Sequence, residues 1–530
     1  MEGIAERGIF IRSRSKSRRA QVFIEQSIKA FFGGNALVAV IVLALITIFL
    51  FREGFGFFGQ NLSNLRLYRQ AGLEYVDIIR AVSTDHEALS RKLSEIRLRE
   101  FRTLEKRNAS PEQITAALAA FDQFASDFGD TAENLHGLVS DLTEQASGLK
   151  EKLFARAELM AQRSQLERNG DHEAAAKIVV PEVDRAAALA SLHHGAATFE
   201  TVSAEITAKL YNLLATAPAL PDPAGQKDFE QWKTRTREYL STLPAASEKL
   251  RTWSPDTPIP WYRSMSSFLF GREWVTASFW QDWYGIVPLL VGSVMVSLVA
   301  LLIAVPLGVA SAVYVSEIAA RQEKRVIKPY IEFISAIPSV VLGFFGIAVV
   351  GQAIRAASQS AWLKWVSFFP ISERLNIVTA GCLLALMAVP TIFTLAEDAL
   401  RNVPRGFKEA SYALGANRLQ TIVRVIVPAS LSGIVSAVLL GLGRVIGETM
   451  VVLLCAGNRI AIPDFSQGIG SIFQPVHTMT GIIAQEMGEV VRGSTHYRAL
   501  FMVGLVLFTI TLGINWLAQK FVARFRMSIG

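Results

Sequence analysis

Two oppositely charged side chains lie inside a long apolar segment of this 530-residue chain. Arg444 precedes Glu448 by four residues in LGLGRVIGETM, so a continuous helix would place both on one face. A charge near the middle of a membrane span is costly and generally faces a bundle interior, a partner or a transport pathway. The guanidinium offers a planar fork of donors that suits a tetrahedral oxyanion. The pair therefore predicts an anion pathway or, alternatively, a structural ion pair that fixes helix register.

The elements that must position this pair are membrane spans. The chain is 51% hydrophobic and 19% charged, whereas soluble domains carry about 25% charged residues. Cys382 and Cys455 are its two cysteines, and both lie in apolar segments, which excludes a disulfide scaffold and a zinc finger. Six stretches are long and apolar enough to cross a bilayer as helices. They lie near 30–51, 286–315, 331–352, 377–397, 431–456 and 499–520.

Lysine and arginine set the expected orientation of these spans. They are concentrated in the N-terminal tail and in the short loops 316–330 and 398–430, which predicts that both chain termini lie in the cytoplasm. Residues 52–285 then lie outside the membrane on the opposite side. Apolar residues recur there at helical spacing, with prolines at the expected helix breaks Asn108–Pro111, Pro181, Pro221, Pro223 and Pro244. This segment is expected to be helical, as a docking surface, a spacer or a sensor.

A second motif lies between the fourth and fifth spans, in KEASYALGANRLQTIVRVIVP at 408–428. Glu409 and Ala410 are followed five residues later by Gly415, and the segment resembles the EAA loop of ABC importer permeases. The pattern predicts a short helix up to Leu414, a sharp turn at the glycine and a second helix over 419–425. The resemblance implies that this loop docks on a cytoplasmic ATPase; the alternative is an ordinary amphipathic connection.

Further segments narrow the resemblance to the phosphate-specific permeases of PstC type. They are LGLGRVIGETM, IEFISAIPSVVLG at 331–343, WYGIVPLLVGS at 283–293 and FLFGREW at 268–274, and the likeness covers about 265–525. It implies an all-α, polytopic membrane protein with six transmembrane helices, a type I ABC importer permease of the MetI-like kind, plus a helical extracytoplasmic domain. The expected organisation is a basic cytoplasmic tail (1–29), a first span (30–51), a helical periplasmic insertion (52–285) and a five-helix core (286–525) with the EAA loop near 401–428.

The resemblance also implies the setting and the partners. The chain is expected in the bacterial inner membrane, among membrane lipid, with a homologous PstA-like permease, a PstB-like ATPase dimer and a periplasmic PstS-like phosphate-binding protein. GLGRVIG lacks the GK[ST] of a nucleotide-binding loop, so a separate subunit must hydrolyse ATP. The chain is expected to have no catalytic residue, metal or cofactor. Nucleic acid is not expected as a partner, because the basic excess belongs to the apolar part of the chain.

For phosphate the charged pair has a specific chemistry. Glu448 can accept a hydrogen bond from a protonated phosphate oxygen, whereas sulfate, unprotonated at neutral pH, would be repelled. Ser335 and Ser339, around Pro338 in the predicted third span, are further candidates to bind substrate, although kinking and packing of the helix is the favoured role for them. Two other functions stay open: a permease for sulfate, molybdate or phosphonate, and a transmembrane sensor that uses the helical insertion.

Overall fold

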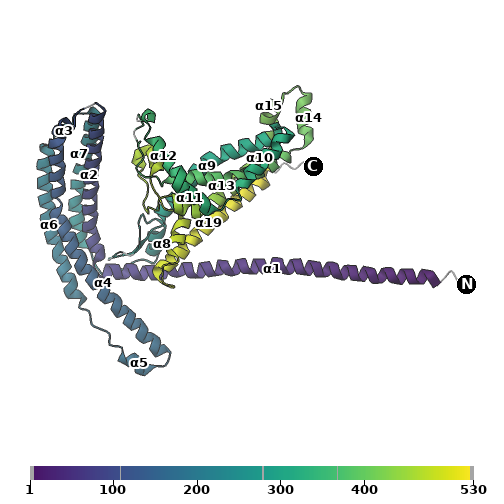
Figure 1. Cartoon of the computed structure of the whole chain (residues 1–530). Helices are drawn as coiled ribbons and strands as arrows, with labels where there is room; N and C mark the ends of the chain where they lie inside the picture. Colours follow the sequence, from purple (N-terminus) through teal and green to yellow (C-terminus); the bar gives the residue numbers. More distant parts are fainter. Residues whose placement is uncertain are drawn as a thin grey trace. The chain divides into compact units, whose positions relative to one another are not determined.

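The computed structural model describes residues 5–525 except 108, 277, 279, 364 and 367. The extreme ends of the predicted N-terminal tail and C-terminal segment, and Asn108 of a predicted break, lie outside the described residues. Within the described part, helices dominate, and the strands are the two-residue pair β1 (Trp274–Val275) and β2 (Trp283–Tyr284). The chain divides into two compact units (Figure 1).

The transmembrane unit comprises the chain up to Gln60, Ser266–Trp274 and the chain from Trp283 onward. Its elements, besides the strands, are α1 (Ala5–Gln70), α8 (Tyr262–Leu269), α9 (Val287–Val313), η1 (Tyr314–Ile318), α10 (Arg321–Ile334), α11 (Ser339–Phe345), η2 (Gly346–Val350), α12 (Gly351–Ser358), η3 (Ala361–Leu363), α13 (Ile377–Arg401), α14 (Arg405–Ala413), α15 (Arg418–Thr421), η4 (Ile422–Ile426), α16 (Val427–Gly447), α17 (Met450–Cys455), η5 (Phe465–Phe473), α18 (Met479–Glu486) and α19 (Thr495–Phe525). The first and second of these helices extend beyond the unit's boundaries.

Six helical stretches among the described residues are long and apolar enough to cross a membrane, which confirms the predicted all-α, six-span fold class. They are Glu25–Gln70, Val287–Ile318, Ser339–Ser358, Ile377–Arg401, Arg418–Gly447 and Thr495–Lys520. The third stretch begins later than predicted. Residues 335–338 interrupt the helix ahead of it, because Pro338 cannot continue a helical hydrogen-bond ladder and instead caps α11.

Small side chains allow the spans to pack closely. α13 lies against both α9 and α16, and the buried residues between them include Ala300, Ala304, Ala385 and Ala388. Side chains of this size let helix backbones approach, and van der Waals packing then replaces the hydrophobic drive that is absent in lipid. This packing holds the fourth span at the centre of the unit, beside the span that carries the charged pair.

The insertion unit comprises Asn61–Met265 and Val275–Asp282. Its helices are α2 (Leu73–Lys106), α3 (Pro111–Asp130), α4 (Glu133–Arg168), α5 (His172–Lys177), α6 (Arg185–Ala215) and α7 (Pro223–Thr252). Aromatic side chains form much of its core: Phe229 stacks on Trp232, which meets the rings of Phe124 and Phe128 edge-on. The predicted helical character of this segment agrees with these elements.

Local sequence signals explain most of the helix starts in this unit. Ser110 caps α3 with a capping box, and Pro111 is its first residue, as the break at this point predicts. Asp222 caps α7 without such a box: its side chain accepts from the N–H of Ala224, and Pro223 is the first residue of the helix. The break predicted at Pro244 is wrong, because this proline lies inside α7. The buried side chains of Leu240, Leu243, Ala246 and Leu250 hold the helix on both sides of it, so tertiary packing overrides local propensity.

One buried histidine makes the stability of the insertion unit depend on pH. His86 stacks on Phe128 with ring centroids 4.3 Å apart, and its Nε2 lies 3.0 Å from the Phe128 carbonyl oxygen. Its Nδ1 is buried without a hydrogen-bond partner among the described residues. Burial lowers the pKa of His86 to about 4; the contact with the Phe128 carbonyl and Glu87 opposes this shift, and His136 adds to it.

We expect the free energy of unfolding of this unit to fall as the pH falls. The folded-state pKa of His86 lies below its ordinary value of 6.5, so the stabilisation is complete above about pH 6.5 and is lost as pH falls toward 4. The full effect is at most about 3 kcal/mol. Hydrogen exchange of α2 and α3 in the full-length protein, measured in urea at pH 7 and pH 5, should show it.

His86→Phe is the matched control for this prediction. It retains an aromatic ring on Phe128 and removes the titrating group, while Thr131 Oγ1 still donates to the Phe128 carbonyl (2.7 Å). The difference in unfolding free energy between pH 7 and pH 5 should therefore shrink in the variant. An equal pH dependence in both proteins would assign the effect to other groups.

Candidate functional site

The fifth span is interrupted at the predicted charged pair. α16 ends at Gly447, Glu448 has an extended backbone conformation with ψ of 133°, and a new helix begins at Met450. Glu448 Oε1 accepts a hydrogen bond from the Met450 N–H (3.2 Å), which satisfies a donor at the start of that helix. The prediction that Arg444 and Glu448 share one face of a continuous helix is wrong, because the helix ends between them.

Arg444 contacts the fourth span rather than Glu448. Its Nη1 donates to Thr391 Oγ1 of α13 (3.0 Å), and the residue is exposed. Among the described side chains no ion pair joins Arg444 to Glu448, so the alternative of a register-fixing pair has no contact to support it. A guanidinium carries five N–H donors. Most of those of Arg444 therefore remain available to an anion.

A small cavity borders the interruption. It is lined by Glu448, by hydroxyl groups from two distant segments and by apolar side chains: Ser293, Val296 and Ser297 of α9, Leu384 of α13, Val445, Ile446 and Val452 of the broken span, and Thr478 and Thr480. Its empty space is about 180 Å³, of which about 10 Å³ admits a water-sized sphere. That is room for about one water molecule. In this conformation the cavity is closed to a tetrahedral oxyanion.

Hydrogen bonds from the lining hydroxyls satisfy the irregular backbone around the cavity. Thr480 Oγ1 donates to the backbone oxygen of Glu448 (2.8 Å), and Ser293 Oγ accepts from the N–H of Met479 (2.9 Å). Thr478 Oγ1 lies 3.3 Å from Thr480 Oγ1. Non-helical backbone at membrane depth persists only where protein groups or water satisfy it in this way. These hydroxyls therefore hold Glu448 at the break.

A glycine permits the two segments to meet. A Cβ atom on Gly292 would lie 2.0 Å from the backbone oxygen of His477, well inside van der Waals contact. The absence of a side chain at this position lets the segment that carries Thr478 and Thr480 lie directly against α9. The neighbouring Ser293 is thereby brought within hydrogen-bond distance of that segment.

The other predicted substrate residues lie elsewhere. Ser335 caps α10 and its Oγ donates to the Glu332 carbonyl oxygen of the same helix (2.6 Å), while Ser339 is the first residue of α11. Neither lines the cavity. The sequence prediction omits Ser293 and Ser297, whose four-residue spacing in an otherwise apolar span is a signal that identifies them. Thr478 caps the short helix α18, and Thr480 is the second residue of that helix. No sequence signal identifies either threonine as a cavity residue.

The 405–426 loop, which contains the EAA-like motif, has the predicted helix–turn–helix geometry. α14 ends in a turn at Gly415, which has a φ of +82°, a value that glycine adopts without a steric penalty. The N–H of Gly415 donates to the Tyr412 oxygen (2.9 Å) and that of Ala416 to the Ser411 oxygen (3.2 Å), which is the Schellman pattern of helix termination. α15 follows, capped by Asn417, and continues into η4.

This loop presents apolar and acidic side chains to its surroundings. Leu414 is 90% exposed and Leu419 65% exposed, and Glu409 and Ala410 lie on the exposed surface of α14. Figure 1 shows α14 and α15 together at one end of the transmembrane unit. Exposed leucines clustered on one projection are typical of a surface that binds another protein.

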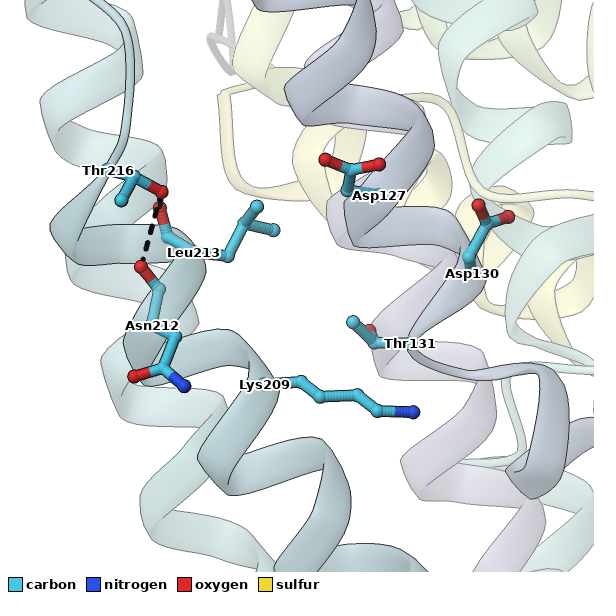
Figure 2. A pocket seen from close by; sticks show the side chains of 7 residues that line it. All are labelled: Asp127, Asp130, Thr131, Lys209, Asn212, Leu213 and Thr216. Carbon is cyan, nitrogen blue, oxygen red and sulfur yellow. Dashed lines mark hydrogen bonds between the residues drawn. The ribbon is translucent and has the colours of Figure 1, made fainter.

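The insertion unit carries a surface hollow of its own, between α3 and α6. Figure 2 shows Asp127 and Asp130 on one side and Lys209 reaching from the other. The hollow has a volume of about 480 Å³, and these three charged residues are exposed. Thr216 Oγ1 bonds to the Asn212 oxygen of its own helix (3.3 Å). Solvent therefore hydrates these charges, whereas Glu448 is half-buried beside its cavity.

Comparison with known proteins identifies the family. Residues 304–527 match the family described as "Binding-protein-dependent transport system inner membrane component". The Probable ABC transporter permease protein YqgH of Bacillus subtilis (strain 168) is 37% identical over 242 residues, which cover 45% of this chain and 72% of that protein. The Phosphate transport system permease protein PstC of Pasteurella multocida (strain Pm70) is 30% identical over 272 residues, or 50% of this chain and 82% of that protein.

Another relative and a solved structure are also similar to about half of this chain. The Phosphate transport system permease protein PstC of Haemophilus influenzae is 31% identical over 272 residues, 49% of this chain and 84% of that protein. A structure of the MetNI methionine ABC transporter in an inward-facing conformation covers 46% of this chain and 94% of its own, with 20% identity and a TM-score of 0.33. Each alignment to a relative leaves about half of this chain unmatched.

Proposed function

This chain belongs to the inner membrane permeases of the ABC transporters, of the PstC type, and we propose that it forms half of the translocation pathway of an ATP-driven phosphate importer. The family makes it a multi-pass inner membrane subunit that works with an ATPase and a substrate-binding protein. The observation that carries the proposal is the break of the fifth span, which holds Glu448 against a hydroxyl-lined cavity one turn beyond an exposed Arg444.

Arg444 and Glu448 divide the recognition of phosphate between them. The guanidinium donates to the deprotonated oxygens, and the carboxylate accepts a hydrogen bond from the oxygen on which phosphate retains a proton at neutral pH. In the present conformation the cavity is too small for the anion, so passage requires the helices around it to separate. Such a change between two arrangements of the spans is alternating access, and it involves no covalent chemistry on phosphate.

The 405–426 loop is the proposed contact with the ATPase. Glu409 and Ala410 are exposed on α14, Gly415 makes the turn, and the exposed leucines Leu414 and Leu419 supply apolar surface for a complementary cleft. ATP binding and hydrolysis by that subunit would then move the loop and, through it, the spans. This chain itself performs no hydrolysis in the proposal.

The remaining partners follow from the same assignment. We propose a PstA-like permease as the other half of the pathway, a dimer of PstB-like ATPases and a periplasmic PstS-like phosphate-binding protein. The positive charge of the tail and of the loops 316–330 and 398–430 supports an orientation with both termini in the cytoplasm. The insertion unit is then periplasmic, on the side from which the binding protein delivers phosphate.

The test is uptake of radiolabelled phosphate into vesicles that contain this chain, the partner permease, the ATPase and the binding protein. We expect uptake that requires ATP and that is unaffected by excess sulfate or molybdate. Transport of another oxyanion in place of phosphate would support the permease function and contradict phosphate as the substrate. An intact assembly that imports none of these anions would favour the sensor function and direct attention to the insertion unit.

A further inference from the structure

Two basic side chains fasten the 405–426 loop to the end of the second span. Lys408 Nζ of α14 lies 2.7 Å from Oε1 and 2.8 Å from Oε2 of Glu317 in η1. Arg418 of α15 donates from Nη2 to the backbone oxygens of Glu317 and Ile318, the latter at 3.3 Å. Both helices of the loop therefore meet the same turn of the chain, at the point where the second span ends.

The ion pair is shielded, unlike the many surface pairs of this protein. The Glu317 side chain is 10% exposed and that of Lys408 is 27% exposed. Ser316 Oγ also donates to Glu317 Oε1 (3.0 Å), so both carboxylate oxygens have partners. Exposed ion pairs contribute little to binding or stability, whereas a shielded pair is costly to break because it leaves a charge without compensation. We therefore expect this contact to persist when the loop is displaced.

The second span connects this contact to the cavity. α9 continues into η1 without a break, and the combined helix Val287–Ile318 carries Ser293 and Ser297 near its start and Glu317 at its end. At 1.5 Å per residue, Ser297 and Glu317 are about 30 Å apart along the axis. A continuous helix transmits displacement of its end over that distance, and Ser293 bonds directly to the segment that holds Glu448 in place.

We propose that Glu317 is a positioning residue that couples the 405–426 loop to the cavity through the second span. This proposal rests on the proposed function, in which the loop contacts an ATPase and the cavity lies on the transport pathway. Motion of the loop pulls on Glu317 through Lys408, the whole of α9–η1 follows, and the hydroxyls of Ser293 and Ser297 move relative to Glu448. Val315 of η1 and Ile422 and Ile426 of η4 also belong to one buried hydrophobic cluster. Apolar packing of this kind can slide, whereas the ion pair to both carboxylate oxygens sets a fixed register.

The experiment compares Glu317→Gln, Lys408→Gln and the double variant in the reconstituted complex. We expect each single variant to retain ATP hydrolysis and to import about tenfold less phosphate per ATP hydrolysed. The double variant should lose no more than either single variant, because all three lack the same contact. Asp398→Asn is the matched control: it removes an exposed carboxylate that has no side-chain partner among the described residues, and the ratio should be unchanged.

The proposal would be overturned if the losses of phosphate import per ATP in the two single variants added up in the double variant. A parallel loss of ATP hydrolysis and uptake would also overturn it, because that result indicates a purely structural contact. A cargo-independent readout separates this outcome from failure of the phosphate assignment. Spin labels at the exposed positions Leu298 of α9 and Leu512 of α19 should report an ATP-dependent change of distance in the parent complex. Glu317→Gln should reduce that change; a change as large as in the parent complex would contradict the coupling role whichever anion is carried.

Discussion

Replacement of Arg444 by glutamine should reduce the initial rate of phosphate uptake about 30-fold, the equivalent of the roughly 2 kcal/mol that a charge-assisted hydrogen bond contributes. The guanidinium is exposed beside the break of the fifth span, and its one hydrogen bond to a described residue is to Thr391, so its other donors are available to the anion. Glutamine removes the charge and the fork together. Radiolabelled phosphate uptake in reconstituted vesicles measures the loss.

Two further variants separate the role of the charge from that of the contact. Arg444→Lys keeps the charge without the planar fork and should recover part of the rate. Thr391→Val removes the hydrogen-bond partner of the guanidinium and leaves both its charge and its donors, so uptake should fall much less than in Arg444→Gln. Full uptake by Arg444→Gln would exclude this residue from the pathway.

Replacement of Glu448 by glutamine should relax the discrimination between phosphate and sulfate. The carboxylate repels an anion that has no proton to share, and like charges in contact cost several kcal/mol. Glutamine removes the charge and adds N–H donors, so sulfate should inhibit phosphate uptake at concentrations at least about tenfold lower than in the parent protein. Competition by unlabelled sulfate, titrated against a fixed concentration of labelled phosphate, measures the change.

Thr480→Val is the control for this second prediction. It removes the hydroxyl that donates to the Glu448 backbone oxygen but leaves the carboxylate in place. Uptake should slow, because the break loses a support, while sulfate should remain a poor competitor. Sulfate inhibition that is identical in the parent and in Glu448→Gln would show that another residue selects the anion.

Local properties of the sequence were sufficient for the overall architecture. Whether a stretch crosses a membrane depends on the summed hydropathy of its own residues, and the six predicted stretches correspond to the six in the structure. The turn at Gly415 is equally local, because only the residue's own freedom at positive φ decides it. The capping box at Ser110 follows for the same reason.

The positions of the helix breaks depended on more than the local sequence. Pro244 signals a break and lies inside a helix, because buried neighbours on the same helix outweigh its effect. The converse holds at Glu448, where a helical pattern gives way to extended backbone. The segment LGLGRVIGETM contains no signal for this break, because the backbone oxygen of Glu448 is hydrogen-bonded by Thr480, a residue 32 positions further along the chain.

The sequence by itself determined that this protein is a six-span, all-helical permease with a helical insertion and a charged pair in its fifth span, because hydropathy and short motifs are properties of neighbouring residues. Only the tertiary structure decided what surrounds that pair. Thr391 contacts Arg444, Thr480 contacts Glu448, and Ser293 contacts Met479, because packing and the close approach at Gly292 bring together residues about 30 to 190 positions apart. Hydrogen-bond satisfaction in a medium without water is a property of the whole assembly of helices.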